Sequence, residues 1–484
     1  MLDKPERVFD RGREWAGLVS FVSNSYPGAM LGVVSGRRRQ GKSFLLEALT
    51  SVTGGLYFPA LEETEAVSLR AFAAALVRQG IPVSRPLQDW SDAIALLFAS
   101  VRDEPRVVVI DEFPFLVKTS PSLPSVIQRE LGPGGSGQDS RARLLLCGSA
   151  MSVMGGLLAG HAPLRGRASL ELLVQPFGYR DAARFWGADD PKLAALLHAV
   201  VGGTPAYRRE FVAFDVPAGL ADFDAWITRT VLNSQSPLFR EARYLLAEET
   251  DIRDPALYHS VLGAIASGNR TNGGIANYVG RKSAEITHPL NVLEDCALIA
   301  RDPDVFRRGR FTYRVAEPLI TFYEVVMRPE WFRLEAGEAA EVWRDQRAGF
   351  LGRVVGPHFE TICRDFALRA SGQLFGGPAA EVGSGVVNNP VGKTQIEVDV
   401  AVLGAASPGE RRRILSLGEV KWGDTMDRRH VERLAAARDL LAADYDVSDC
   451  VLACYSAAGF DEDLRADAVS DPRLILVGLA DIYP

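Results

Sequence analysis

The sequence predicts an α/β protein with several domains. In the first half, strand-like runs at residues 31–34, 55–61, 107–110 and 143–147 alternate with stretches of helical periodicity. That alternation predicts a parallel sheet covered by helices. In the last third, strand-like runs at 396–402, 414–422, 450–455 and 474–477 follow a long helical stretch and indicate a second α/β unit. A chain of 484 residues is long enough for about three domains.

The first of these strands leads into a glycine-rich turn and then a helix. Gly36, Gly41, Lys42 and Ser43 fit the pattern G-x-x-x-x-G-K-S. In such a loop, backbone N–H groups point at phosphate oxygens, the lysine reaches the β- and γ-phosphates, and the serine hydroxyl ligates Mg²⁺. A chance glycine-rich turn is the alternative, but the flanking strand and helix are the context that the pattern requires. The stretch therefore predicts a site for ATP and Mg²⁺.

The third strand ends in two carboxylates. Residues 107–110 are all β-branched, which is typical of a strand buried on both faces, and Asp111 and Glu112 follow directly. Ligand groups in a parallel sheet gather at the carboxyl ends of its strands. We expect Asp111 to hold Mg²⁺ through water and Glu112 to orient or deprotonate the attacking water. An ordinary acidic turn is the alternative.

Two further features of this half carry groups for the γ-phosphate. Ser149 follows the fourth strand and is either a polar sensor of that phosphate or the N-cap of a helix. Arg165 and Arg167 lie on a turn that contains glycine. They are either surface arginines or guanidinium groups that stabilise charge on the phosphate.

Six short motifs occur in an order that resembles the archaeal-type ATPases of the STAND branch of AAA+-related P-loop proteins. This resemblance spans roughly residues 5–335. It implies that Arg11 lies near the nucleotide, that Arg167 senses phosphate, and that Pro205 lies beside the base. It also implies a switch in which ATP and ADP states differ in how a helical lid sits. The motifs are Phe9–Glu14, Gly36–Ser43, Val107–Glu112, Gly148–Ser149, Leu164–Ala168 and Gly202–Tyr207.

Residues 256–327 read as three helices followed by a two-stranded wing, which is the pattern of a winged helix. Basic residues fall at the start of the predicted recognition helix and at the tip of the wing, where DNA phosphates would lie. A plain spacer between domains is the alternative. The resembling ATPases also carry a winged helix at this position. The candidate DNA contacts are Arg281, Lys282, Arg307, Arg308 and Arg310.

The last third carries a separate set of acidic residues. Asp399 lies on an alternating strand, and Glu419 and Lys421 share one face of the next strand. Two carboxylates suit Mg²⁺, and a lysine beside them can orient water or neutralise charge on a phosphate. Glu360, on a preceding helix, is placed to complete the metal shell. A solvent-facing polar strand edge is the alternative.

This set resembles the PD-(D/E)xK nuclease fold, in particular a domain of unknown function often fused behind archaeal-type ATPases. That family's Glu-x-Lys-Trp ending matches Glu419-Val-Lys421-Trp422. The strand of Asp399 lacks the preceding proline of the family pattern, which is a variable position. The resemblance implies Mg²⁺-dependent cleavage of DNA.

The predicted domains are residues 1–172 (P-loop core), 173–250 (helical lid), 251–335 (winged helix) and 336–484 (nuclease-like domain). A net charge of −7 excludes a global basic field, so nucleic-acid contacts must be local. Five scattered cysteines and the absence of a long apolar run predict a cytoplasmic protein without a membrane partner. The function that we expect is an ATP-hydrolysing, DNA-binding, Mg²⁺-dependent nuclease. A homo-oligomer or an assembly that depends on the bound nucleotide is compatible with the expected switch. The alternative is a nucleotide-switched DNA- or protein-binding regulator whose last domain does not cut.

Overall fold

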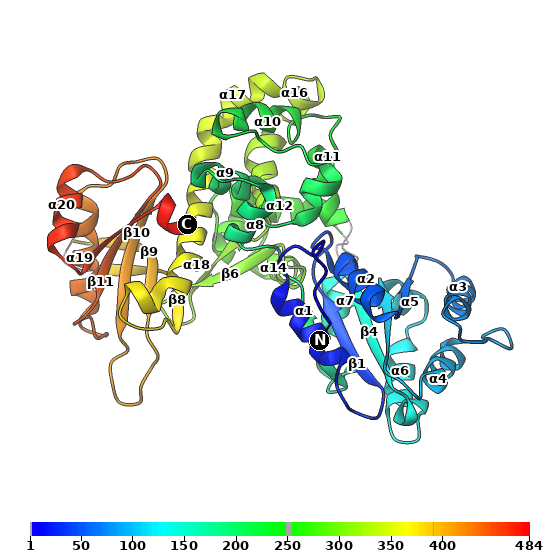
Figure 1. Cartoon of the computed structure of the whole chain (residues 1–484). Coiled ribbons are helices and arrows are strands. Elements are labelled where there is room, and N and C mark those ends of the chain that lie inside the picture. Colours follow the sequence, from blue (N-terminus) through cyan, green and yellow to red (C-terminus); the bar gives the residue numbers. More distant parts are fainter. Residues whose placement is uncertain (1, 248–253, 391) are drawn as a thin grey trace. The chain divides into compact units, whose positions relative to one another are not determined.

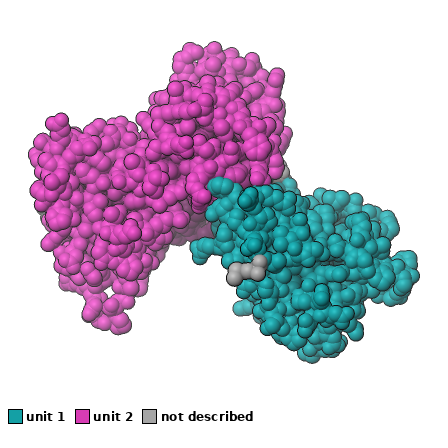
Figure 2. Space-filling model, viewed as in Figure 1, with its two compact units in different colours: residues 1–176, 249–251 teal, residues 177–248, 252–484 magenta. Residues whose placement is uncertain are grey.

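The chain forms two compact units, shown in different colours in Figure 2. This is a computed structural model, and it describes residues 2–247, 254–390 and 392–484. The first unit extends to Pro176 and the second begins at Phe177. This boundary lies just after the one predicted from the sequence, and the finer division into four domains stays a prediction.

Unit 1 is built on five parallel strands in the order β2-β3-β4-β1-β5. The three central strands are apolar along nearly their whole length because helices cover both faces. The expected strands at residues 31–34, 107–110 and 143–147 are confirmed. The strands are β1 (Met30–Ser35), β2 (Leu56–Pro59), β3 (Arg106–Asp111), β4 (Ala142–Gly148) and β5 (Ala168–Leu173).

Helices of unit 1 pack in two hydrophobic clusters, one on each face of the sheet. Side chains of α1 and α2 pack on one face, and those of α3 to α6 pack on the other. The helices are α1 (Gly12–Val22), α2 (Lys42–Thr53), α3 (Glu65–Arg78), α4 (Trp90–Ser100), α5 (Phe113–Thr119), α6 (Leu123–Leu131) and α7 (Met151–Gly156), with a 3₁₀ turn at Ser136–Asp139.

Unit 2 begins with a helical region and continues into the predicted winged helix. Among the described residues of this region, the expected helices at 256–267, 275–279 and 283–294 are confirmed. Its helices are α8 (Tyr179–Trp186), α9 (Pro191–Val201), α10 (Phe223–Arg229), α11 (Pro237–Ala247), α12 (Pro255–Ala266), α13 (Asn272–Val279), α14 (Ser283–Asp295), α15 (Pro318–Phe322) and α16 (Trp331–Glu335), with shorter turns at Tyr207–Phe211, Leu220–Asp222, Tyr323–Met327 and Arg328–Glu330.

The wing is an antiparallel hairpin of β6 (Ile299–Pro303) and β7 (Phe311–Val315), but its tip is not exposed along its whole length. The backbone N–H of Val305 donates to the carbonyl of Ser384, and Phe306 packs edge-on against Tyr445. Arg307 is only 18% exposed and donates to the side chain of Asn388. The expectation that Arg307 faces DNA phosphates is therefore wrong, because the wing tip docks on the last domain.

The last part of the chain is a mixed five-stranded sheet in the order β12-β11-β10-β9-β8. Strands β10, β11 and β12 are parallel, and β9 and β8 run antiparallel. Figure 1 shows α18 on one face of this sheet and α19 with α20 on the other. The elements are α17 (Ala339–Phe350), a π-helical turn (Leu351–Val355), α18 (Gly356–Leu374), β8 (Glu381–Asn389), β9 (Thr394–Leu403), β10 (Ile414–Lys421), α19 (Arg428–Leu441), β11 (Val451–Ser456), α20 (Glu462–Ser470), β12 (Leu474–Gly478) and α21 (Leu479–Ile482).

Two strands were not predicted from the sequence. Strand β5 lies at the edge of its sheet and alternates between partly buried and exposed residues, and β8 is rich in glycine. All five cysteines are buried free thiols, as expected. In the part of the chain that the structure describes, no helix has the length and apolar character needed to cross a membrane.

Candidate nucleotide site and carboxylate cluster

The loop between β1 and α2 has a backbone that only glycine can form at two positions. Gly36 has φ of 149°, and a Cβ there would lie 2.4 Å from the carbonyl oxygen of Val174. Gly41 has φ of 84° and precedes the first residue of α2. L-residues rarely adopt such angles, so both glycines are needed for the loop to wrap. The N-terminus of α2 thus faces the inside of the loop, a position that favours anions.

Lys42 is buried inside this loop. Its Nζ donates to the carbonyl oxygen of Arg37 at 2.8 Å. Burial lowers the pKa of Lys42, while the nearby carboxylates of Glu112 and Asp111 act in the opposite direction. A charge held by a neutral carbonyl in a partly desolvated loop is available to a phosphate oxygen, which would be a stronger partner.

Asp111 ends β3 and is 3% exposed. Burial alone would raise the pKa of its carboxyl, but hydrogen bonds from Cys147, Ser43 and Tyr57 outweigh burial and lower it. The Tyr57 hydroxyl, at the end of the neighbouring strand, donates directly to Oδ2. The run at residues 55–61 predicted that strand, but Tyr57 was not recognised as a partner of Asp111. Its position two residues before the strand ends was the available signal.

Ser149 and Glu112 lie together at the same edge of the sheet. The Ser149 hydroxyl donates to both Glu112 oxygens, at 3.1 and 3.2 Å, and Arg38 Nε donates to Ser149 at 3.3 Å. The following helix has Ala150 as its N-cap, so Ser149 does not cap it. Glu112 itself has φ of 49°, a strained angle for a non-glycine residue and one often found at functional sites.

The residues present fit Mg²⁺. The Ser43 hydroxyl and the Asp111 carboxylate are hydrogen-bonded neighbours at the open edge of the sheet, and both are oxygen ligands of the kind that this ion prefers. Arg11 reaches the loop as well, since its Nη2 donates to the carbonyl of Gln40 at 3.0 Å.

Arg167 lies at the end of the sheet where the strands begin, opposite to the glycine-rich loop. It is exposed and directly precedes β5, whose first residue, Ala168, pairs with Leu31 at the start of β1. The glycine loop follows the other end of β1, about 13 Å away at the usual rise of a strand. The prediction that Arg167 senses phosphate is therefore wrong. Pro205 belongs to unit 2, so its expected position beside the base stays a prediction.

Asp399 and Glu419 come from the adjacent antiparallel strands β9 and β10. The backbone N–H of Val420 donates to Asp399 Oδ2 at 2.9 Å. Burial, followed by the charge of Glu360, raises the pKa of Asp399 to about 7. Burial also raises the pKa of Glu360. Carboxyl groups whose pKa values rise together are crowded acidic groups with few compensating donors.

The second oxygen of Glu419 distinguishes this carboxylate. Oε1 forms ion pairs with Lys421 at 3.0 Å and Arg433 at 3.2 Å. Oε2 is buried and has no hydrogen-bond partner among the residues that the structure describes. A buried carboxylate oxygen without a donor is costly, and a cation or a water molecule would satisfy it.

Glu360 does not complete a metal shell. Its closest charged partner is Arg364, at 3.7 Å. Across residues 2–247, 254–390 and 392–484, no three His, Cys, Asp or Glu side chains are arranged to hold a metal ion. Any metal here would therefore rely on Asp399, Glu419 and water.

The basic residues of the winged helix differ in exposure. Arg281 and Lys282 lie exposed just before α14, and Arg308 and Arg310 are exposed on the wing. Only Arg307 is withdrawn from solvent by its contact with Asn388.

Comparisons with known proteins find only distant similarity to this chain. No protein-family model matches the chain. An uncharacterized protein of Methanocaldococcus jannaschii is 27% identical over 346 residues, which is 69% of this chain and 72% of that protein. Because the identity is low, the STAND resemblance stays a prediction.

Among solved structures, a Walker-type ATPase of Pyrococcus abyssi is similar with a TM-score of 0.49 and 19% identity, covering 67% of this chain and 98% of its own. The ORC2 protein of Aeropyrum pernix follows with a TM-score of 0.38 and 16% identity, covering 72% and 100%. Scores this low do not establish a shared fold, so the nucleotide site is inferred from the chain's own geometry.

Proposed function

We propose that the protein binds and hydrolyses ATP. The observation that carries the proposal is the convergence of Lys42, the Ser43–Asp111 pair and the Ser149–Glu112 pair at one edge of a parallel sheet. Loop N–H groups and Lys42 would bind the β- and γ-phosphates. A bound Mg²⁺, held by Ser43 and Asp111, would neutralise charge on the phosphate oxygens.

Glu112 is the candidate base. It would accept a proton from the water that attacks the γ-phosphorus as the bond to the bridging oxygen of ADP breaks. Ser149 and Arg38 hold the carboxylate in position through a short chain of hydrogen bonds. Arg11 contacts the loop through its hydrogen bond to the carbonyl oxygen of Gln40.

Release of phosphate from ATP tests this proposal directly. Lys42→Ala should abolish hydrolysis and weaken binding of a fluorescent ATP analogue, because the charge on the β- and γ-phosphates is lost. Lys118→Ala is the matched control, since Lys118 is exposed and pairs with Glu62. Equal hydrolysis by wild type and Lys42→Ala would refute the proposal.

A second candidate function is Mg²⁺-dependent cleavage of DNA by the last domain, and the unpartnered Glu419 Oε2 is the observation that favours it. Asp399 and Glu419 would hold a hard cation, which would activate water and steady the phosphate. Lys421 lies beside Glu419 and would neutralise charge that builds on the phosphorus. Exposed Arg281, Lys282, Arg308 and Arg310 would hold duplex DNA through its phosphates.

Cleavage of labelled linear, circular and single-stranded DNA tests this second function, with Mg²⁺, Mn²⁺ or EDTA and with or without ATP. Wild type should cut in the presence of metal, and Asp399→Ala should not. Glu432→Ala, an exposed carboxylate on α19, is the control. Absence of cutting by wild type in every condition would favour the binding-only regulator.

A further inference from the structure

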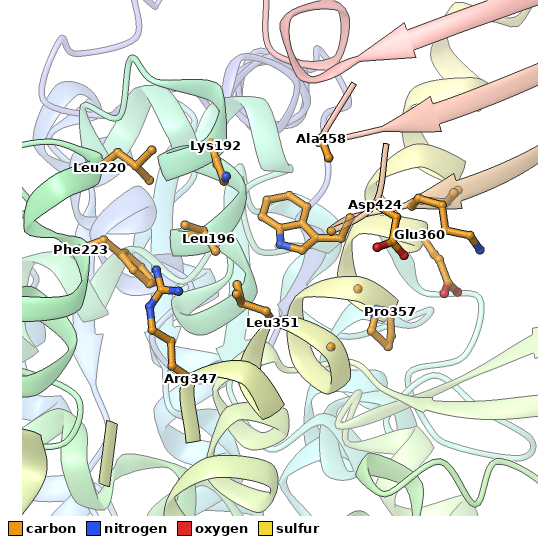
Figure 3. A pocket seen from close by; sticks show the side chains of 16 residues that line it. Lys192, Leu196, Leu220, Phe223, Arg347, Leu351, Pro357, Glu360, Asp424 and Ala458 are labelled. Carbon is orange, nitrogen blue, oxygen red and sulfur yellow. The ribbon is translucent and has the colours of Figure 1, made fainter. Parts of the chain in front are cut away.

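A cavity of about 600 Å³ lies in unit 2 beside the carboxylate cluster. Figure 3 shows Leu196 and Leu351 facing it from one side, and the carboxylates of Glu360 and Asp424 on the other. Lys421 also lines the cavity. One end of the cavity therefore borders the proposed cleavage chemistry, and the other end combines apolar side chains with Lys192 and Arg347.

The position of this cavity in the fold is typical of a ligand site. It opens at the carboxyl ends of the parallel strands β10 and β11, where residues from Val420 to Asp424 and Ala458 form its wall. Ligands of open α/β sheets bind at that edge. The opposite wall includes Leu351 and Gly352, which belong to the π-helical turn between α17 and α18. Such turns are frequent at functional sites.

The wall chemistry is mixed in a way that suits a nucleotide. Trp422 is partly buried and is held at one edge by Phe359, at 5.3 Å between ring centroids. Phe223 and Arg347 lie close together on the far side of the cavity (Figure 3). Lys192 is exposed in the first turn of α9. Indole faces stack on bases, and lysine and arginine bind phosphates.

We propose that this cavity takes one unpaired nucleotide of a DNA strand, with the base against Trp422 and the apolar wall and its phosphate toward Lys421. The inference rests on the proposed DNA-cleaving function. A volume of about 600 Å³ is within the range for single small ligands, whereas a base pair would bring two backbones with it. A base that is already unpaired enters such a pocket at the least cost. The preferred strand is therefore single-stranded, overhanging or mispaired at the cutting site.

The test fills the cavity without touching the candidate ligands. Gly352→Leu puts a side chain where a Cβ now meets nothing within 4 Å. Gly372→Leu is the matched control, because Gly372 is also an exposed glycine of this helical run with open space around it, and it does not line the cavity. Lys192→Glu reverses a cavity charge at an exposed position that tolerates an acidic residue early in a helix.

Binding is measured by anisotropy in EDTA with a fluorescein-labelled single strand and with a blunt-ended duplex of the same strand annealed to its complement. Gly352→Leu should weaken binding of the single strand about tenfold and Lys192→Glu several-fold, while affinity for the duplex stays unchanged. Gly372→Leu should bind both as wild type does. The proposal is overturned if Gly352→Leu binds the single strand normally, or if Gly372→Leu loses as much.

The assay separates this inference from the nuclease proposal because no metal is present. If the wild-type protein never cuts DNA but Gly352→Leu weakens binding of the single strand, the pocket proposal stands and the nuclease proposal fails. If the wild-type protein cuts DNA and Gly352→Leu binds the single strand normally, the nuclease proposal stands and the pocket proposal fails.

Discussion

The two candidate sites each use the carboxyl end of one strand, β3 in unit 1 and β10 in unit 2, but they are assembled differently. In unit 1, Gly36 to Ser43 are consecutive, and their backbone angles largely define the loop. In unit 2, Glu360, Asp399 and Glu419 come from one helix and two strands. The backbone of a contiguous motif sets its geometry locally, whereas the geometry of a dispersed cluster depends on how the strands of the sheet pair.

The two lysines also differ in what holds them. Lys42 donates to a neutral carbonyl, so a phosphate can replace its partner at little cost. Lys421 is paired with Glu419, so a phosphate must compete with a carboxylate, and a cation bound at Glu419 would relieve that competition. Under the proposed functions, Lys42 can therefore bind a phosphate directly, whereas Lys421 becomes available to one when a cation binds Glu419.

Among substitutions that preserve the size of the side chain, Glu112→Gln is expected to have the largest effect. Glu112→Gln should lower turnover of ATP by roughly 10²- to 10⁴-fold and leave affinity for ATP nearly unchanged, because only the proton acceptor is lost. Steady-state hydrolysis and a binding titration measure the two quantities. Loss of binding equal to loss of turnover would mean that Glu112 holds the loop together instead of acting as a base.

The wing residues sharpen the comparison at the level of DNA contact. Arg308→Glu with Arg310→Glu should weaken duplex binding about tenfold or more and reduce its salt dependence, since these exposed side chains would face phosphates. Arg307→Gln should leave the salt dependence unchanged because Arg307 bonds Asn388. A gel-shift titration at several salt concentrations measures both. Unchanged affinity of the double reversal would favour the spacer interpretation.

A further effect concerns stability and a histidine pair within unit 2. His198 Nδ1 lies 2.8 Å from His358 Nε2, and burial lowers the pKa of His198 to about 4. Because the unfolded pKa is near 6.5, the unfolded chain binds the proton more tightly, and stability is lost as pH falls from about 6.5 toward 4.

At about pH 5 this linkage costs roughly 2 kcal/mol. His198→Gln should flatten the dependence of Tm on pH in that window, and His288→Gln, at an exposed position of α14, should not. Thermal melts across the window measure this. Parallel curves for wild type and His198→Gln would contradict the assigned role of the pair.

Local signals predicted a good deal of this structure. The run Val107 to Ile110 with Asp111 behind it sufficed for a buried strand and an acid at its end, because both depend on neighbouring residues. Arg167 was misjudged because only the pairing of Ala168 with Leu31 shows which sheet edge it occupies. The docked wing was missed because Val305 and Phe306 contact Ser384 and Tyr445, which lie far away in the sequence.

The central claim is that one chain carries two separate sites, and a single preparation can test it. ATP hydrolysis and metal-dependent DNA cleavage should be measured side by side for wild type, Lys42→Ala and Asp399→Ala. The account predicts that Lys42→Ala stops hydrolysis, and that Asp399→Ala stops cleavage while hydrolysing ATP at the wild-type rate. Hydrolysis that survives Lys42→Ala, or that falls with Asp399→Ala, would contradict it.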